Sequence, residues 1–178
     1  GGSSLYKPFI QQLVQDNPDK EILLIYGSTE AEPIASFSAS DYLDQVANSD
    51  RALPVGQVHH SIKVAIVQTN DGHVHELDEE ECGEIIVAGP HVLKDYYKNE
   101  EANKGTFTED GWYRTGDVGA ITPSGLKLIA RKDRIFKLSN GEKVVPTDLE
   151  KLIEKKCNYI SFAIVTGGGH EYPVALLF

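Results

Sequence analysis

The sequence has no methionine, two cysteines, one tryptophan and fewer basic than acidic side chains. Two cysteines cannot form a disulfide framework, and the separation of Cys82 and Cys157 fits no zinc-finger spacing. With 17 Lys and Arg against 27 Asp and Glu, the net charge of −10 argues against a general nucleic-acid or anionic-membrane binder. No apolar run approaches the roughly 20 residues of a transmembrane helix.

Other absences concern the processing of the chain and its location in the cell. The missing methionine and the Gly1-Gly2 start predict a processed chain or a piece of a longer protein. No charged-then-apolar stretch resembles a signal peptide, and two cysteines suit a reducing compartment. Together these features predict a cytoplasmic location.

What is present is an ordinary globular composition with 40% hydrophobic and 25% charged residues. Helical spacing of apolar residues predicts a helix over residues 5–14, and the apolar run 22–25 predicts a strand buried on both faces. Alternation with turns predicts strands between residues 62 and 138, and Pro146 predicts the start of a helix. The predicted class is α+β: an α/β start over residues 1–54, a β-rich middle over 55–131 and a small α/β tail over 132–178.

The first segment that suggests chemistry is Tyr26-Gly27-Ser28-Thr29-Glu30, directly after the apolar run. Loops at buried strand ends of α/β sheets are common places for ligands. A hydroxyl on Thr29 suits a phosphate, and a carboxylate on Glu30 suits a divalent cation. Taken alone, five residues of this kind are more often a surface turn.

Two further segments suggest a nucleotide. In Tyr113-Arg114-Thr115-Gly116-Asp117, the carboxylate of Asp117 suits two ribose hydroxyls, although a hairpin turn with a surface ion pair explains the same residues. In the basic stretch over residues 131–137, the guanidinium of Arg131 suits a phosphate or ribose, although a solvated strand pair is the plainer interpretation.

In their order and spacing the three segments resemble the AMP-forming adenylate-forming superfamily, which includes acyl-CoA synthetases, nonribosomal peptide adenylation domains and luciferases. The resemblance covers nearly the whole chain. It rests on the Gly-Gly start, YGSTE (residues 26–30), the stretch from Gly83 through Gly89, Tyr96 and Phe107, YRTGD (113–117), and Arg131-Lys132-Asp133 with Lys137, Gly141 and Glu150.

The resemblance implies a role for each matching residue. Thr29 would bind the α-phosphate, Glu30 would coordinate Mg²⁺, and Asp117 would hold the ribose hydroxyls. Arg131 would contact the ribose or phosphate side, Asp133 would be the hinge of a mobile C-terminal lid, and Lys137 would act in thioester formation. The residues expected to bind ATP or AMP are Gly2, Ser3, Tyr26, Gly27, Ser28, Thr29, Asp117 and Arg131, and those expected to be catalytic are Thr29, Glu30 and Lys137.

The chemistry implied is an ATP-dependent acid:thiol ligase that activates a carboxylic acid as an acyl-adenylate and then forms a thioester. ATP, Mg²⁺ and coenzyme A are the implied cofactors, with a carrier-protein thiol as the other acceptor. The resemblance also implies a large domain with a barrel-like β-rich subdomain over residues 55–131 and the start of a lid over 132–178. The stretch KLSNGEKVVP (residues 137–146) is more similar to fatty-acyl or aryl-acid activating members than to peptide synthetases.

The sequence departs from the family in ways that bear on activity. Ala130 stands where Gly is usual, and Asn140 is an extra residue in its turn. No phosphate loop precedes Gly1, and no lysine follows Lys156. We therefore expect the chain by itself to be inactive in pyrophosphate exchange. The alternative interpretation is a non-catalytic nucleotide-binding or interaction module derived from the family.

Overall fold

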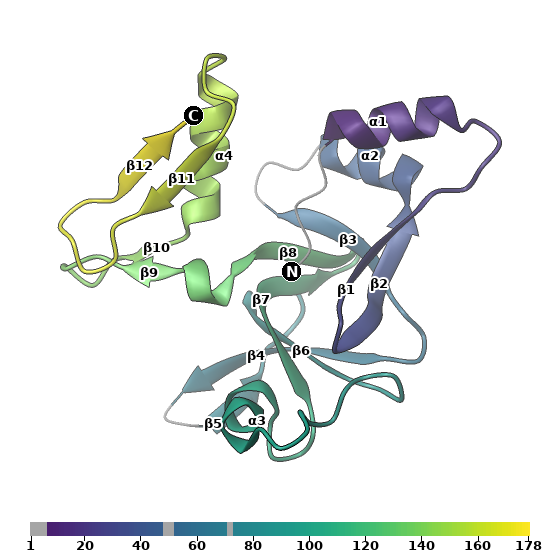
Figure 1. Cartoon of the computed structure of the whole chain (residues 1–178), viewed down its shortest axis with the longest axis vertical. Helices are drawn as coiled ribbons and strands as arrows, with labels where there is room; N and C mark the ends of the chain where they lie inside the picture. The colour runs from purple at the N-terminus through teal and green to yellow at the C-terminus, as the bar shows by residue number, and fades with distance from the viewer. Residues whose placement is uncertain (1–6, 48–51, 71–72) are drawn as a thin grey trace. The chain divides into compact units, whose positions relative to one another are not determined.

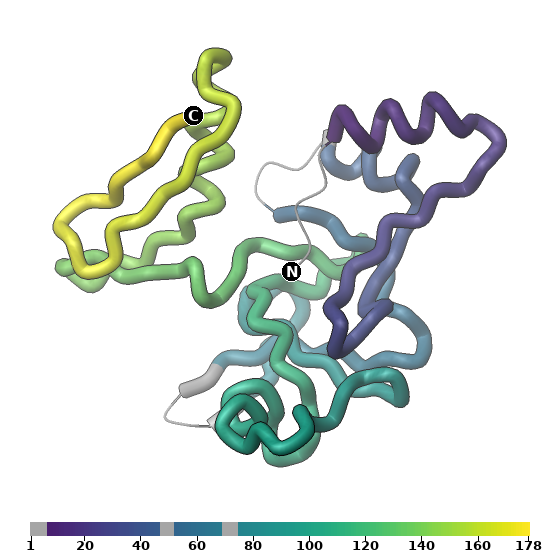
Figure 2. Tube along the Cα trace, viewed as in Figure 1, coloured from purple at the N-terminus to yellow at the C-terminus, as the bar shows by residue number. Residues whose placement is uncertain are grey.

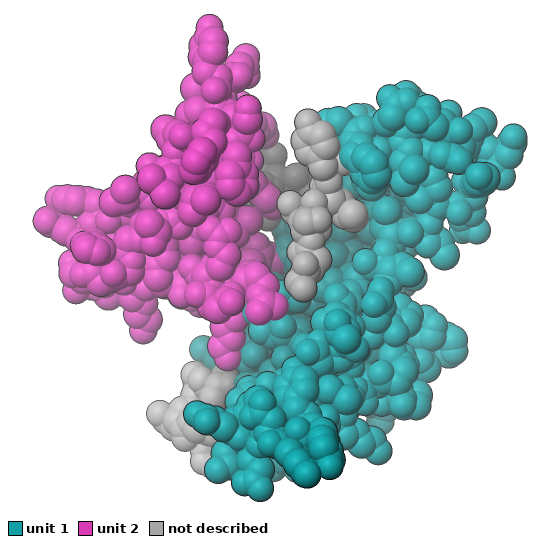
Figure 3. All heavy atoms as spheres, in the orientation of Figure 1, with its two compact units in different colours: residues 1–128 teal, residues 129–178 magenta. Residues whose placement is uncertain are grey.

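The computed structural model describes residues 7–47, 52–70 and 73–178. The chain divides into two compact units, residues 1–128 and residues 129–178 (Figure 3). The expected boundaries at residues 54 and 131 stay predictions.

The first unit is built on an eight-stranded antiparallel sheet with strand order β1-β2-β3-β8-β7-β6-β4-β5 (Figure 1). The mixture of helices with a large antiparallel sheet confirms the α+β class. The strands are β1 (Leu23–Ser28), β2 (Ala31–Ser38), β3 (Leu53–Val58), β4 (Lys63–Asn70), β5 (His73–Glu76), β6 (Gly83–Ala88), β7 (Tyr113–Thr122) and β8 (Gly125–Arg131), and the helices are α1 (Lys7–Asp16), α2 (Ala39–Ala47) and α3 (Glu100–Thr106).

The two N-terminal helices lie side by side and pack on β1 and β2 (Figure 1). Pro8 stands in the first turn of α1, where its missing N–H breaks no helical hydrogen bond. Ile10 of α1, Leu24 of β1, and Phe37 and Tyr42 form a buried cluster between them. This cluster fixes the start of the strand that leads to YGSTE.

The prediction of a strand buried on both faces is wrong for β1. Leu24 is buried, but Leu23 and Ile25 on the opposite face are 55% and 56% exposed. The reason is that α1 and α2 pack on the face of β1 that carries Leu24, whereas the face of Leu23 and Ile25 is exposed. The chain turns back at residues 29–30 into β2, which the sequence analysis did not predict (Figure 2).

The larger core of the first unit lies on the strands that follow. Ile34 of β2, Val55 of β3, Ile85 of β6 and Leu126 of β8 are buried together. The Asn70 to His73 pairing of β4 with β5 confirms the hairpin predicted at this place. These strands form the scaffold that carries YRTGD in β7.

The second unit consists of short elements around one helix. After a 3₁₀ turn, η1 (Lys132–Arg134), the hairpin β9 (Phe136–Lys137) and β10 (Lys143–Val144) precedes α4 (Pro146–Lys156) and the hairpin β11 (Ala163–Thr166) and β12 (Val174–Leu177). The helix predicted from Pro146 is confirmed. The strands predicted up to residue 138 are interrupted at η1, because the Ile135 N–H bonds to Lys132 O and closes the 3₁₀ turn.

In the part of the chain that the structure describes, no helix is long and apolar enough to cross a membrane.

Candidate functional site

The YGSTE segment lies at the end of β1 and in the turn to β2. A β-bulge separates Tyr26 from Ser28, because the single residue Gly27 of β1 faces the three residues of β2 that lie between Ala31 and Ala35. Only glycine fits at position 27: an added Cβ would lie 2.7 Å from the Ala31 carbonyl oxygen. The close approach of the two strands presents Thr29 in the exposed turn and leaves Glu30 half-buried.

The YRTGD segment contains a second bulge, in β7. Between the pairs Glu84–Val118 and Ile86–Arg114, the single residue Ile85 of β6 faces the three residues 115–117 of β7. Gly116 makes this possible with a φ of +72°, a conformation that L side chains rarely adopt. Bulges of this kind redirect a side chain out of the strand's regular alternation. The redirected residue here is Asp117.

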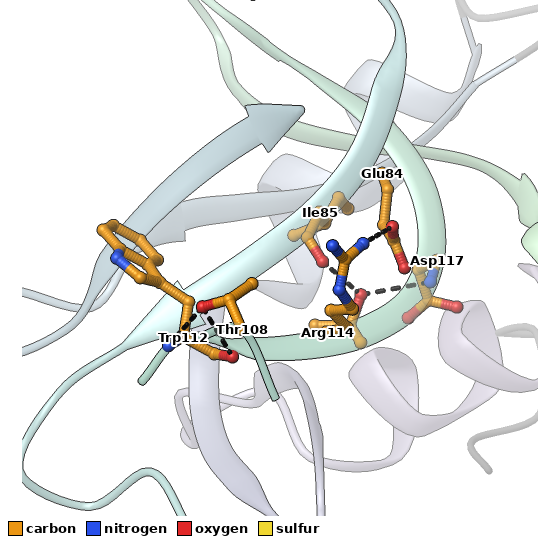
Figure 4. A network of polar contacts seen from close by, with 7 residues as sticks. Glu84, Ile85, Thr108, Trp112, Arg114 and Asp117 are labelled. Carbon is orange, nitrogen blue, oxygen red and sulfur yellow. Dashed lines mark hydrogen bonds and ion pairs between the residues drawn. The ribbon is translucent and has the colours of Figure 1, made fainter. Parts of the chain in front are cut away.

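A buried threonine anchors this bulge to the neighbouring strand. The Thr115 hydroxyl donates to the Ile85 carbonyl oxygen over 2.8 Å, and its oxygen accepts from the Asp117 N–H over 3.1 Å (Figure 4). The backbone of Asp117 is thereby fixed to β6. Its carboxylate makes a contact beyond the strand, with Tyr26 of β1.

The two segments meet through one hydrogen bond. The Tyr26 hydroxyl donates to Asp117 Oδ2 over 2.7 Å. Burial of the phenol, together with the charge of Asp117, raises the pKa of Tyr26 above its ordinary value. Tyr26 is therefore a neutral donor at neutral pH, and the Asp117 carboxylate is its acceptor.

Glu30 is held by two other tyrosines. Tyr96 donates to Glu30 Oε1 over 2.8 Å, and Tyr113 donates to Oε2 over 3.4 Å. The bond from Tyr96 lowers the pKa of Glu30, and the carboxylate in turn raises the pKa of Tyr96 to about 12. Ser28 completes the group, with its hydroxyl 3.3 Å from the Tyr113 oxygen. Glu30 is thus a charged, oriented carboxylate.

An ion pair and a tight turn also hold β7 in place. Arg114 Nη1 lies 2.7 Å from Glu84 Oε2, with side chains only 18% and 7% exposed, and Figure 4 shows the two pointing toward one another. Before the strand, the Trp112 N–H donates to the Thr108 hydroxyl over 2.9 Å. These contacts are structural, because they hold β7 to β6 and close the turn that leads into it.

The donor set fits a magnesium–nucleotide complex better than a protein-enclosed metal. Among the described residues, no group of three or more His, Cys, Asp or Glu is arranged to hold a metal ion. Mg²⁺ commonly takes one or two protein carboxylates, with waters and substrate phosphates completing its coordination. Glu30 provides one such carboxylate, beside the exposed turn residue Thr29.

The remaining expected site residues lie elsewhere. Gly2 and Ser3 are outside the described residues. In the second unit, Arg131 pairs with Asp133 at 3.4 Å, with side chains 50% and 71% exposed, and Lys137 is exposed on β9. The structure therefore brings together Tyr26, Ser28, Glu30 and Asp117 of the first unit, while Arg131, Asp133 and Lys137 belong to the second.

The sequence analysis missed the part played by Tyr96 and Tyr113. For Tyr113 a signal existed, because it stands in the same strand segment as Thr115 and Asp117. Tyr96 is among the residues that carry the family resemblance, but no local signal pairs it with Glu30, which is 66 residues away in the sequence.

Comparison with known proteins identifies the family. Residues 1–97 match the model of the AMP-binding enzyme family, and residues 133–178 match the model of the AMP-binding enzyme C-terminal domain. The chain belongs to the AMP-binding enzymes. The resemblance found in the sequence is thereby confirmed.

Curated AMP-binding enzymes related to this chain are much longer than it. The chain is 31% identical to "Acyl-CoA ligase 891, peroxisomal" of Penicillium roqueforti over 93% of its own length and 23% of that protein. It is 35% identical to "Long chain acyl-CoA synthetase 7, peroxisomal" of Arabidopsis thaliana over 80% of its length and 19% of that protein. The chain thus spans about a fifth of the length of these relatives.

Solved structures of AMP-binding enzymes show the same fold. O-succinylbenzoate coenzyme A synthetase (MenE) from Bacillus subtilis, in complex with ATP and magnesium ion, aligns with a TM-score of 0.71 at 26% identity. The same enzyme in complex with the acyl-adenylate intermediate OSB-AMP aligns with a TM-score of 0.72 at 25% identity. Both alignments cover 99% of this chain and 35% of the other.

Proposed function

We propose that this chain provides the ribose- and metal-binding part of an ATP-dependent acid:thiol ligase of the acyl-CoA synthetase type. The observation that carries the proposal is the Tyr26–Asp117 hydrogen bond of 2.7 Å, which joins the segments YGSTE and YRTGD. In this proposal Asp117 provides the carboxylate for the ribose and Glu30 provides the carboxylate for the metal.

Each residue of the group has a distinct proposed role. Asp117 accepts hydrogen bonds from the two ribose hydroxyls, and Tyr26 fixes the orientation of that carboxylate. Thr29, in the exposed turn, donates to the α-phosphate, while Tyr26, Gly27 and Ser28 line the adenylate pocket. Glu30 holds Mg²⁺, which when bound neutralises charge on the phosphates.

The proposed reaction has two steps. A carboxylate oxygen of the acid attacks the α-phosphorus of ATP, and the bond to the β-phosphate oxygen breaks, so that pyrophosphate leaves and an acyl-adenylate remains. A thiolate then attacks the acyl carbonyl, and AMP leaves with the bonding electrons. Residues that hold the α-phosphate and ribose in fixed positions lower the barrier by orientation and charge stabilisation.

The roles proposed for the second unit rest on the family resemblance. Arg131 would contact the ribose or phosphate, Asp133 would be the hinge, and Lys137 would act in thioester formation. Gly2 and Ser3 are proposed to contact the adenylate on the same basis.

The names of the relatives support the substrate class. One relative is a long chain acyl-CoA synthetase and another is an acyl-CoA ligase, so we propose a fatty or aryl carboxylic acid as substrate and coenzyme A as thiol acceptor. ATP and Mg²⁺ are proposed because MenE binds both in an aligned structure. A cytoplasmic location stays a prediction; the two relatives carry "peroxisomal" in their names.

AMP binding to this chain tests the proposal. Calorimetric titration with AMP should give saturable binding that Asp117→Asn weakens by at least about tenfold, because a charged acceptor for hydrogen bonds is lost. Asp95→Asn, at an exposed position outside the group, removes the same charge and should bind as the unsubstituted chain does. Equal binding by all three chains, or none by any, would refute the proposed ribose site.

A further inference from the structure

Both carboxylate oxygens of Glu30 accept a tyrosine hydroxyl, and the two tyrosines come from parts of the chain far from the turn. Tyr96, between β6 and α3, donates to Oε1 over 2.8 Å. Tyr113, the first residue of β7, approaches Oε2 at 3.4 Å. The backbone of the turn is fixed as well, because the Leu93 N–H donates to the Glu30 carbonyl oxygen over 2.7 Å.

Tyr96 is itself held before any ligand binds. Its N–H donates to Asn103 Oδ1 over 2.7 Å, and Asn103 Nδ2 donates back to the Tyr96 carbonyl oxygen over 3.1 Å. The Phe107 ring packs against the Tyr96 ring at 5.7 Å and against the Tyr113 ring at 5.8 Å, measured between centroids. One aromatic side chain thus supports both phenols that contact Glu30.

Such support matters for a single carboxylate that binds a metal. A glutamate in a two-residue turn samples several rotamers, whereas Mg²⁺ demands near-ideal octahedral geometry. An ionised carboxylate has about four lone-pair sites. Each phenol occupies one site on a different oxygen, so the carboxylate is held at both of its oxygens. Hydrogen bonds to a metal-ligating carboxylate commonly change metal affinity 10- to 100-fold.

We propose that Tyr96, supported by Phe107 and assisted by Tyr113, is the positioning residue that orients Glu30 toward the Mg²⁺ of bound ATP. The inference rests on the proposed function, since it takes Glu30 as the metal ligand. It adds Tyr96, a residue outside YGSTE and YRTGD, to the residues that act on the proposed metal ligand.

The test separates metal binding from nucleotide binding. Tyr96→Phe removes only the hydroxyl, and Tyr97→Phe makes the same change next to it on a side chain that is 85% exposed. For each chain, ATP affinity is measured across a Mg²⁺ series and AMP affinity is measured without Mg²⁺. Glu30→Gln and Asp117→Asn serve as reference variants for the metal side and the ribose side.

We expect Tyr96→Phe to raise the Mg²⁺ concentration for half-maximal enhancement of ATP binding by about tenfold. Its AMP affinity should remain within about twofold of the unsubstituted chain, and Tyr97→Phe should change neither quantity. A purely structural role for the Tyr96 hydroxyl would instead lower AMP affinity together with ATP affinity, and that result would overturn the inference.

The remaining outcomes separate the two proposals. If Tyr96→Phe responds to Mg²⁺ as the unsubstituted chain does while Glu30→Gln loses the response, the positioning inference is wrong and the proposed function stands. If Glu30→Gln keeps the full Mg²⁺ response, or no chain shows one, the proposed metal site is wrong and the inference falls with it. In both cases, the AMP affinities of the unsubstituted chain and of Asp117→Asn still test the proposed ribose site.

Discussion

Tyr26 and Asp117 are separated by 91 residues in the sequence, yet the hydroxyl of the first lies 2.7 Å from Oδ2 of the second. The tyrosine stands on edge strand β1 and the aspartate in a bulge of β7, with β2, β3 and β8 between these strands in the sheet order. A contact across that distance requires the first strand to leave the plane of the sheet, and the strong twist of β1 and β2 is visible in Figure 1. The geometry of the proposed nucleotide site therefore depends on the curvature of the whole sheet.

Tyr26→Phe should destabilise the first unit by about 1.5 kcal/mol, because the Asp117 carboxylate loses a hydrogen-bond donor at a partly buried position. Urea unfolding followed by tryptophan fluorescence measures the change. Tyr97→Phe, at an exposed side chain, is the matched control and should leave the midpoint unchanged. An unchanged midpoint for Tyr26→Phe would show that the bond contributes no net stability.

Gly27→Ala should destabilise the chain by about 1–3 kcal/mol, because the new methyl would lie 2.7 Å from the Ala31 carbonyl oxygen and force β1 and β2 apart. Gly105→Ala in α3 introduces the same methyl where nothing lies within 4 Å, and it should be neutral or slightly stabilising. Thermal unfolding of the two variants side by side checks the contrast. Similar melting temperatures would contradict the close approach.

Glu84→Gln should cost much more stability than Asp133→Asn, although each removes one carboxylate from an ion pair. Glu84 is 7% exposed beside Arg114, so its loss leaves a poorly solvated cation and should cost about 2–4 kcal/mol. Asp133 is 71% exposed beside Arg131, and surface pairs of this kind contribute about 0–1 kcal/mol. Chemical denaturation of both variants measures the difference, and equal losses would contradict the assignment of the first pair as structural.

The contribution of Glu30 to stability should disappear in acid. Its pKa in the folded chain is lowered from the usual value near 4.5, so the fold favours the ionised form. The stabilisation is therefore present above about pH 4.5 and is lost as the pH falls through the folded-state pKa. The free energies of unfolding of the unsubstituted chain and Glu30→Gln should differ at pH 7, and the difference should shrink as the pH falls below about 4.5. A difference that does not shrink in acid would contradict the prediction.

The hydrogen bond between Tyr96 and Glu30 should also be detectable in the pKa of Tyr96. With Glu30 ionised, the pKa of Tyr96 is raised to about 12 from its usual 10.0. Glu30→Gln removes the negative charge and weakens the acceptor, so the pKa of Tyr96 should fall toward 10. NMR titration of ¹³C-labelled tyrosine, assigned with Tyr96→Phe, measures the shift directly. A Tyr96 resonance that titrates identically in both chains would show that the two side chains do not interact in solution.

The sequence by itself determined the class of fold, the family and the identity of most candidate site residues. Glycine at position 116, a proline at 146 and apolar spacing in the helices are local signals, because they reflect backbone conformation or burial within one element. The same local logic failed at β1, where an apolar run predicted burial on both faces and half of it is exposed. Burial depends on which elements pack against a strand, and the sequence of the strand itself does not specify those elements.

Only the tertiary structure decided which residues act together. The sheet order places Tyr26 against Asp117, and the segment between β6 and α3 carries Tyr96 to Glu30. Such contacts arise from strand pairing and twist across the whole first unit, so no window of neighbouring residues predicts them. The sequence predicts a set of side chains for phosphate, metal and ribose, and the fold shows which hydroxyl contacts each carboxylate.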